Sequence, residues 1–114
     1  MSRERVVKAL SNLGLTIKDI DVYIILAQEG PRETHFLAEE LKMRQSDLAN
    51  SLEILRNKKM VKTTIKIIPV QFFAVPFEEA MDLLMEANLK EAQVAEKNKK
   101  EILRNWASML KKNH

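Results

Sequence analysis

Cysteine is absent from this chain of 114 residues, and its absence excludes disulfides, iron–sulfur clusters and cysteine-based zinc sites. No apolar run approaches the roughly 20 residues that a membrane-crossing helix requires, and the first ten residues lack the apolar core of a secretion signal. The two histidines, His35 and His114, lie far apart in the sequence. We therefore expect a cytoplasmic protein that holds no metal and no cofactor and does not bind a membrane.

Sequence patterns of catalysis are also missing. The chain contains no glycine-rich phosphate loop, no HExxH and no GxSxG. The acidic pairs Glu39–Glu40 and Glu78–Glu79 are adjacent residues, which point in different directions on a helix, whereas acid–base catalysis needs converging groups. The sequence thus predicts a protein that is not an enzyme.

What the chain does contain fits a folded domain with a basic middle segment. Apolar residues make up 46% and charged residues 31%, and the length leaves room for one domain of roughly 75–80 residues plus an appendage. The net charge is +3, but residues 44–75 hold six basic and two acidic side chains, which gives +4. Such a surface can neutralise DNA phosphates, although a solvated face without a partner carries the same pattern.

Two helices are predicted within the first thirty residues. Apolar residues at helical spacing indicate the first over residues 3–12, and Gly14 suits the left-handed position that follows a helix. Thr16 is a good N-cap for the second helix, with Asp19 three positions later as in a capping box. Gly30 and the proline after it are expected to end this helix.

A helix-turn-helix unit is predicted next. Thr34 is a plausible cap for a short helix that ends near residue 41, and residues 42–44 form a three-residue turn. The following helix spans about 45–58 and begins at Ser46 or at one of the two residues before it. Its buried stripe is expected to be Leu48, Leu52 and Leu55.

A β-hairpin is predicted over residues 61–75. Residues 60–68 are rich in β-branched side chains, with Val61, Thr63, Ile65 and Ile67 on one side of a strand and Lys62, Thr64 and Lys66 on the other. A second β-prone run, 70–75, follows after a tight connection at Pro69. The apolar residues 67–70 are unusual for an exposed turn.

One long helix is predicted for the rest of the chain, because residues 77–111 contain neither glycine nor proline. At 1.5 Å per residue this helix would measure about 50 Å, too long to pack wholly against so small a domain. Its apolar patches favour a helical pair between two copies. The alternative is a helix that folds back on its own domain through a break near Asn88 or Asn98. The expected dimer-interface residues are Leu84, Ala87, Ile102, Trp106 and Met109.

The order and spacing of short sequence pieces resemble those of the TrmB-like transcription regulators of archaea. The pieces are Leu13-Gly14-Leu15-Thr16, Asp21-Val22-Tyr23, Gly30-Pro31, Leu37-Ala38-Glu39-Glu40, Leu52-x-x-Leu55, Lys59-Met60-Val61, and Phe73-Ala74-Val75-Pro76 followed by Glu78-Glu79-Ala80. The resemblance covers about residues 12–85 and implies a winged helix-turn-helix that binds duplex DNA as a dimer. Larger family members carry a C-terminal sugar-binding domain, which this short form lacks, so sugar sensing is not expected and the effector is unknown.

The chain departs from the family pattern at its recognition helix and wing. Asp47 and Glu53 stand where basic residues are common, Ala49 replaces a larger residue, and Lys59 stands where glycine usually caps the helix. The wing also lacks the basic, glycine-rich tip that commonly reaches the minor groove. These positions bear on the strength and the sequence preference of DNA binding.

Together these patterns predict a mainly α protein with a small β-hairpin: a winged helix-turn-helix domain over 1–76 and a long C-terminal dimerisation helix over 77–114. Helix 45–58 is expected in the major groove of DNA with the wing beside it. The side-chain amides of Gln45 and Asn50 can form hydrogen bonds with adenine, and the charged groups of arginine and lysine can contact phosphates. The alternative is a winged-helix module that binds protein. The candidate DNA-binding residues are Thr34, Arg44, Gln45, Ser46, Asn50, Lys62 and Lys66.

Overall fold

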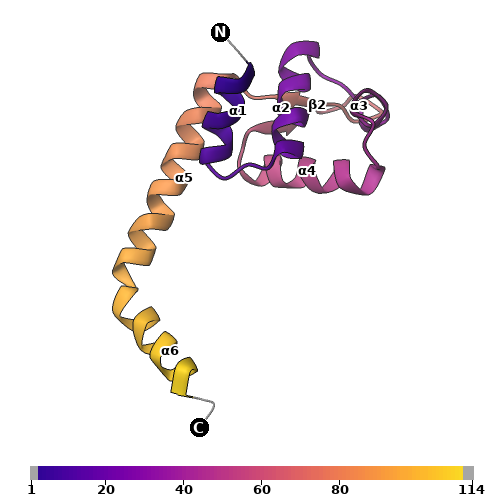
Figure 1. Ribbon diagram of the computed structural model, residues 1–114. Helices are drawn as coiled ribbons and strands as arrows, with labels where there is room; N and C mark the ends of the chain where they lie inside the picture. The colour runs from indigo at the N-terminus through magenta and orange to yellow at the C-terminus, as the bar shows by residue number, and fades with distance from the viewer. Residues whose placement is uncertain (1–2, 112–114) are drawn as a thin grey trace. The chain divides into compact units, whose positions relative to one another are not determined.

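The computed structural model describes residues 3–111, which form helices and one two-stranded antiparallel sheet (Figure 1). Contacts divide the chain between Leu84 and Met85 into two units, each described below on its own. The predicted fold class, mainly α with a small hairpin, is confirmed. The elements are α1 (Arg3–Asn12), α2 (Ile17–Glu29), α3 (Thr34–Leu41), α4 (Gln45–Asn57), β1 (Val61–Thr63), β2 (Phe72–Ala74), α5 (Phe77–Lys97) and α6 (Lys99–Lys111).

Helix α2 begins and ends at the residues that the sequence indicates. The Thr16 hydroxyl accepts a hydrogen bond from the Asp19 amide, and the Asp19 carboxylate accepts one from the Thr16 amide, each at 3.3 Å. This reciprocal capping box satisfies two amides that the first turn would otherwise leave unpaired. At the other end Gly30 has a φ of 80°, a conformation that glycine adopts without steric cost.

Helices α3 and α4 are joined as predicted, but the N-cap of α3 differs from the expectation. Lys42 adopts the left-handed conformation and ends α3, and α4 starts three residues later. The N-caps are Glu33 and Arg44, and neither side chain makes a capping hydrogen bond. Thr34 therefore lies in the first turn of α3, and its assignment as the cap was wrong. Helix α4 begins at Gln45, one of the starts that the sequence left open, and Ser46 lies in its first turn.

The wing is shorter than predicted. Three residue pairs join β1 to β2, and a further pair is made where the Thr64 amide donates to the Gln71 carbonyl at 2.9 Å. Beyond that pair the chain leaves the ladder, so Ile65 and Ile67, which were predicted to lie on one side of a strand, are outside β1 and exposed. Arg32 pairs with the opposite edge of β2 in an isolated bridge, in which its amide lies 3.0 Å from the Phe72 carbonyl.

The core of the first unit includes the beginning of α5. Apolar side chains from α1 to α4, the hairpin and the first two turns of α5 form one cluster, in which Ala80 and Leu84 are buried. The first two turns of α5 thus pack into the domain, although they lie beyond the predicted boundary at residue 76. Leu84 is 1% exposed, which leaves no surface for a partner, and its assignment to a dimer interface is corrected accordingly.

The second unit comprises the rest of α5 and α6. The long helix expected here is interrupted at Asn98, one of the two positions where the sequence left a break open. Helical hydrogen bonds continue on both sides, from the Asn98 amide to the Val94 carbonyl and from the Ile102 amide to the Asn98 carbonyl, both at 3.0 Å. The large apolar side chains of this unit are exposed in the single chain. No helix among residues 3–111 is long and apolar enough to cross a membrane.

Candidate nucleic-acid interface

Helix α4 has one buried and one exposed face. The buried side chains are Leu48, Ser51, Leu52 and Leu55, which recur at the spacing of one helical face. The opposite side of α4 is exposed along its first nine residues, through Gln45, Ser46, Ala49, Asn50 and Glu53. A polar helix face of this length is what a recognition helix presents to the major groove.

The acidic residue nearest the start of α4 is held in an ion network. The Asp47 carboxylate lies 3.3 Å from Nε of Arg44 and 3.5 Å from Nζ of Lys18. The hydrogen bond from Arg44 and the charge of Lys18 hold the pKa of Asp47 below its usual range, so this carboxylate is ionised and compensated near neutral pH. Its repulsion of a nearby phosphate is correspondingly reduced.

Arg44 keeps most of its hydrogen-bonding capacity in this network. The bond to Asp47 uses Nε, whereas a guanidinium has five N–H donors in all. The side chain is largely exposed, so its terminal nitrogens face solvent at the start of α4. Arg44 can therefore contact Asp47 and a DNA phosphate at the same time.

Lys18 is a candidate residue that the sequence analysis missed. It lies in the first turn of α2 and reaches across to α4. A lysine at the positive end of a helix dipole is locally unfavourable, and this is the signal that could have indicated a partner elsewhere in the fold. Asn50 lines the same hollow between the start of α2 and α4 as Lys18 and Asp47, so the sequence-predicted Asn50 lies beside this network.

The hairpin carries the basic candidates of the wing. Lys62 on β1 and Lys66 in the connection between the strands are both exposed, and Lys66 has a φ of 67°. They belong to an acid-free segment, residues 54–77, in which no Asp or Glu occurs. The basic side chains of this segment are Arg56, Lys58, Lys59, Lys62 and Lys66.

Arg32 anchors the wing to the helix-turn-helix unit, a role that its sequence position did not indicate. Its backbone pairs with Phe72 of β2, and its guanidinium lies 5.1 Å from the centre of the Phe36 ring in α3. A further nitrogen of Arg32 is 3.6 Å from the Glu29 carboxylate. Arg32 is therefore a positioning residue between α3 and the hairpin.

The remaining predicted DNA contact, Thr34, is separate from the network at α4. It is the first residue of α3, is half-buried, and follows Glu33 directly. The amides of the first turn of α3 still offer a positive helix end to a phosphate. The carboxylate of Glu33 acts against such a contact, so Thr34 is the weakest of the predicted candidates.

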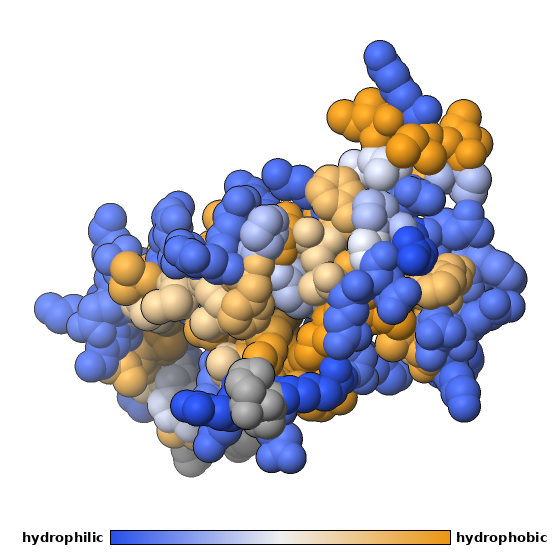
Figure 2. All heavy atoms as spheres, turned by 90° about the horizontal axis from the view of Figure 1, so that it is seen from above, coloured by the Kyte–Doolittle hydropathy of each residue, from blue (hydrophilic) through white to orange (hydrophobic). Residues whose placement is uncertain are grey.

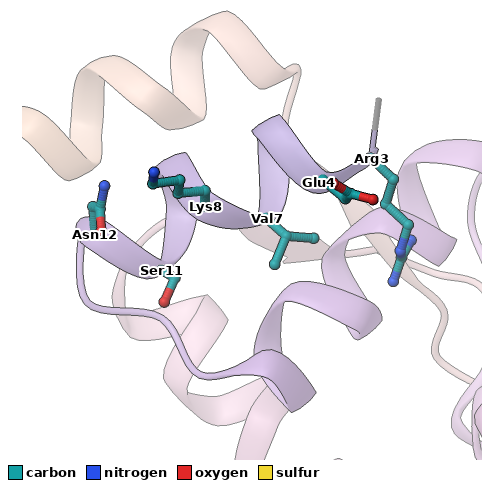
Figure 3. Close-up of a pocket in the computed structure, with 6 residues that line it drawn as sticks. All are labelled: Arg3, Glu4, Val7, Lys8, Ser11 and Asn12. Atoms are coloured by element: carbon teal, nitrogen blue, oxygen red, sulfur yellow. The ribbon is translucent and has the colours of Figure 1, made fainter. Parts of the chain in front are cut away.

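No metal centre is indicated in the described part of the chain. No group of three or more potential metal ligands occurs among residues 3–111; His35 lies 3.3 Å from Glu39, and His114 is outside the described residues. Figure 3 shows a hollow on α1. Its lining residues, Arg3, Glu4, Val7, Lys8, Ser11 and Asn12, come from α1 alone.

The arrangement of a helix-turn-helix followed by an anchored hairpin defines the winged helix-turn-helix class. The chain belongs to the TrmB family: residues 10–78 match the family described as "Sugar-specific transcriptional regulator TrmB". No functionally curated protein matches the sequence. Family membership makes the protein a transcriptional regulator by class and confirms the resemblance read from the sequence.

Solved structures share the fold of this chain. The possible transcriptional regulator from Methanosarcina mazei Go1 is 17% identical, with a TM-score of 0.63 over 84% of this chain and 87% of that chain. The ST1889 protein from the thermoacidophilic archaeon Sulfolobus tokodaii is 19% identical, with a TM-score of 0.64 over 83% and 99%. The multiple antibiotic-resistance repressor MarR from Listeria monocytogenes is 18% identical, with a TM-score of 0.56 over 92% and 81%. At these identities the likeness establishes the fold alone.

Proposed function

We propose that the protein is a homodimeric regulator that binds double-stranded DNA, with α4 in the major groove and the β1–β2 hairpin beside it. The exposed polar face of α4 is the observation that carries this proposal. The acid-free segment 54–77 follows directly and supplies positive charge next to that face. Such a regulator acts where the chromosome lies, so the cytoplasmic location expected from the sequence remains part of the proposal.

The candidate residues divide into base-reading and phosphate-binding groups. Gln45 and Asn50 have amide side chains that can pair with both hydrogen-bonding groups of an adenine edge, and the Ser46 hydroxyl can serve a base or a phosphate. The phosphate-binding group comprises Arg44, Lys62 and Lys66, with Lys18 added from the structure and Thr34 retained from the sequence.

A binding titration on mixed-sequence duplex DNA at several salt concentrations tests this proposal. Log affinity should fall linearly with log salt, with a slope that counts the neutralised phosphates. The double variant Arg44→Glu with Lys66→Glu should weaken binding to all sequences and flatten the slope. Asn50→Ala, as the matched change, should alter the preference among sequences and leave the slope unchanged. Absence of duplex binding at low salt would refute the proposal.

The self-association proposed here uses the second unit. Ala87, Ile102, Trp106 and Met109 are retained as interface candidates, since all four are exposed in the single chain, whereas Leu84 is removed because it is buried. The side chains around the break at Asn98 form a largely apolar hollow. A second copy would cover these groups, which a lone helix leaves in water.

Charge favours an antiparallel pairing of the two copies. Residues 85–97 hold two basic and three acidic side chains, which gives −1, and residues 99–111 hold four basic and one acidic, which gives +3. An antiparallel pair sets the two oppositely charged segments side by side, whereas a parallel pair would set +3 against +3. Asn98, the midpoint between residues 85 and 111, would then lie near the twofold axis.

Because the chain has no cysteine, single-cysteine cross-linking tests this pairing. Asn98→Cys should form a disulfide between copies. Met109→Cys should not, since its two copies would lie about 33 Å apart at 1.5 Å rise per residue. Cross-linking of Met109→Cys would indicate a parallel pair. The fluorescence of the single tryptophan, Trp106, reports dimer formation itself: its emission should shift to the red when dilution separates the copies.

A second candidate function is a winged-helix module that docks on another protein. The exposed apolar side chains at the end of the hairpin favour this candidate, because they differ from the basic tip expected of a DNA-binding wing. Binding that is weak at low salt and insensitive to salt would identify it in the titration above.

A further inference from the structure

The connection between the strands of the hairpin, residues 65–70, is here called the wing tip. Its side chains are unusually exposed for apolar groups: Ile68 is 94% exposed, Ile65 83%, Val70 48% and Ile67 46%. Figure 2 shows exposed hydrophobic side chains that stand out from the body of the molecule, with hydrophilic ones beside them. Single exposed apolar residues are common, but a cluster of this kind marks an interaction surface.

The wing tip is held in place at its base. The Thr64 amide donates to the Gln71 carbonyl at 2.9 Å, and the Gln71 amide donates to the Thr64 hydroxyl at 3.0 Å. Below this pair the strands continue to Val61 and Ala74, and Arg32 fastens the outer edge of β2. The hairpin thus presents the isoleucines on an anchored support.

The surroundings of the wing tip favour a negatively charged partner. Lys66 lies within it and Lys62 at its base, and no acidic residue occurs from 54 to 77. The hairpin also begins four residues after α4 ends at Asn57, so the wing tip is continuous in the chain with the proposed recognition helix. An apolar protein surface would not require this excess of positive charge, whereas duplex DNA combines a charged backbone with apolar stacked bases.

We propose that the wing tip enters the minor groove of DNA and inserts Ile68 between two base pairs, so that binding bends the duplex. Apolar wedges of isoleucine or proline unstack base steps in this way and kink DNA by roughly 20–90°. Lys62 and Lys66 contact the phosphates on either side. This inference rests on the proposed DNA-binding function and adds a deformation of the duplex to it.

The test uses the full chain and a mixed-sequence duplex of roughly 20–30 base pairs, the length of site for which such bends are described, with a fluorescence donor and acceptor at its two ends. Wild-type protein should raise energy transfer as the ends approach. Ile68→Ser should still bind, because Lys62 and Lys66 remain, and the rise in energy transfer should be lost. Met85→Ser, at an exposed apolar residue of α5 outside the wing, is the matched control and should bend DNA as the wild type does.

The outcomes separate this inference from the function on which it rests. Binding by the wild type without a change in energy transfer overturns the wedge and leaves DNA binding intact. A bend that persists in Ile68→Ser also overturns it. No binding of the duplex at any salt concentration overturns both proposals and leaves the protein-docking module as the candidate function. Circular dichroism of each variant shows that the fold is retained, as expected for substitutions at exposed side chains.

Discussion

Replacing Tyr23 by phenylalanine should loosen the attachment of the wing to the body of the domain. The Tyr23 hydroxyl donates a hydrogen bond of 2.6 Å to the Val75 carbonyl, and both residues are buried. Val75 follows β2 directly, and its amide donates to the Met60 carbonyl at 2.8 Å. The bond therefore joins the middle of α2 to the end of the hairpin. The ring itself, whose centre lies 6.4 Å from that of Phe77, would stay in place.

The expected cost follows from what the substitution leaves behind. Phenylalanine removes one oxygen and keeps the apolar contacts, so the change isolates a buried carbonyl without a donor. An unsatisfied buried group of this kind costs about 1–3 kcal/mol. For a domain of this size each 1 kcal/mol lowers the melting temperature by roughly 4–8 °C. Tyr23→Phe should therefore lower the free energy of unfolding by about 1–3 kcal/mol, seen as a clear drop in melting temperature.

Alkaline pH gives the same bond a second test. Burial raises the pKa of Tyr23 above the ordinary value near 10. Above about pH 10 the unfolded chain loses the phenol proton while the folded chain retains it, so this contribution to stability declines as pH rises toward the native pKa. Tyr23 is the only tyrosine, and tyrosinate absorbance therefore follows it alone.

Chemical denaturation of the wild type and Tyr23→Phe, at neutral and at alkaline pH, measures both effects. The difference in unfolding free energy should be largest near neutral pH and shrink above about pH 10, because only the wild type loses stability by this route. Equal stability of the two proteins at neutral pH would show that the Tyr23–Val75 bond does not hold the hairpin.

Three further predictions follow from named contacts. Lys59 has a left-handed φ of 65°, which is strained for a residue with a side chain. Lys59→Gly should therefore raise the unfolding free energy by about 1 kcal/mol in denaturant titrations, and a loss of stability would contradict the strain. Leu84→Ala should lower stability by about 2–5 kcal/mol at every protein concentration, whereas Met109→Ala, 63% exposed, should weaken only concentration-dependent dimer formation. Glu53→Gln should strengthen DNA binding more than Asp47→Asn, because the charge of Asp47 is already compensated by Arg44 and Lys18. If Asp47→Asn gave the larger gain in affinity in a salt series, the ion network of Asp47 would not persist in solution.

Local signals in the sequence predicted the helical part of the fold. The capping box at Thr16 and Asp19 and the glycine that ends α2 at residue 30 involve neighbours within one turn, so a few residues decide where α2 begins and ends. The buried stripe of α4 was predicted for the same reason, since helical spacing alone decides which side chains share a face. The order and spacing of the short sequence motifs, such as Gly30-Pro31 and Lys59-Met60-Val61, also indicated the family.

Features that depend on distant contacts were harder to predict. The alternation of Ile65 and Ile67 suggested a longer strand, but among residues 3–111 the sheet has two strands only, and the chain leaves the ladder at Thr64. Leu84 belongs to an apolar patch that serves the domain core, and its sequence spacing does not distinguish a core from a dimer interface. The bridge from Arg32 to β2 joins residues forty positions apart, and no pattern in the sequence marks it.

Two features of the sequence argue against DNA binding, but the structure places each of them in surroundings that are compatible with it. Asp47 was an acid at the start of a recognition helix, yet it lies between two cations and orients Arg44, whose terminal nitrogens stay exposed. The wing tip lacked the usual basic residues, yet its isoleucines are surrounded by a segment without a single acid. Docking on an apolar protein surface would not require that exclusion of acidic residues over 54–77, whereas on DNA each carboxylate there would oppose a phosphate. The charge of this segment therefore joins the exposed polar face of α4 in favouring the DNA-binding candidate.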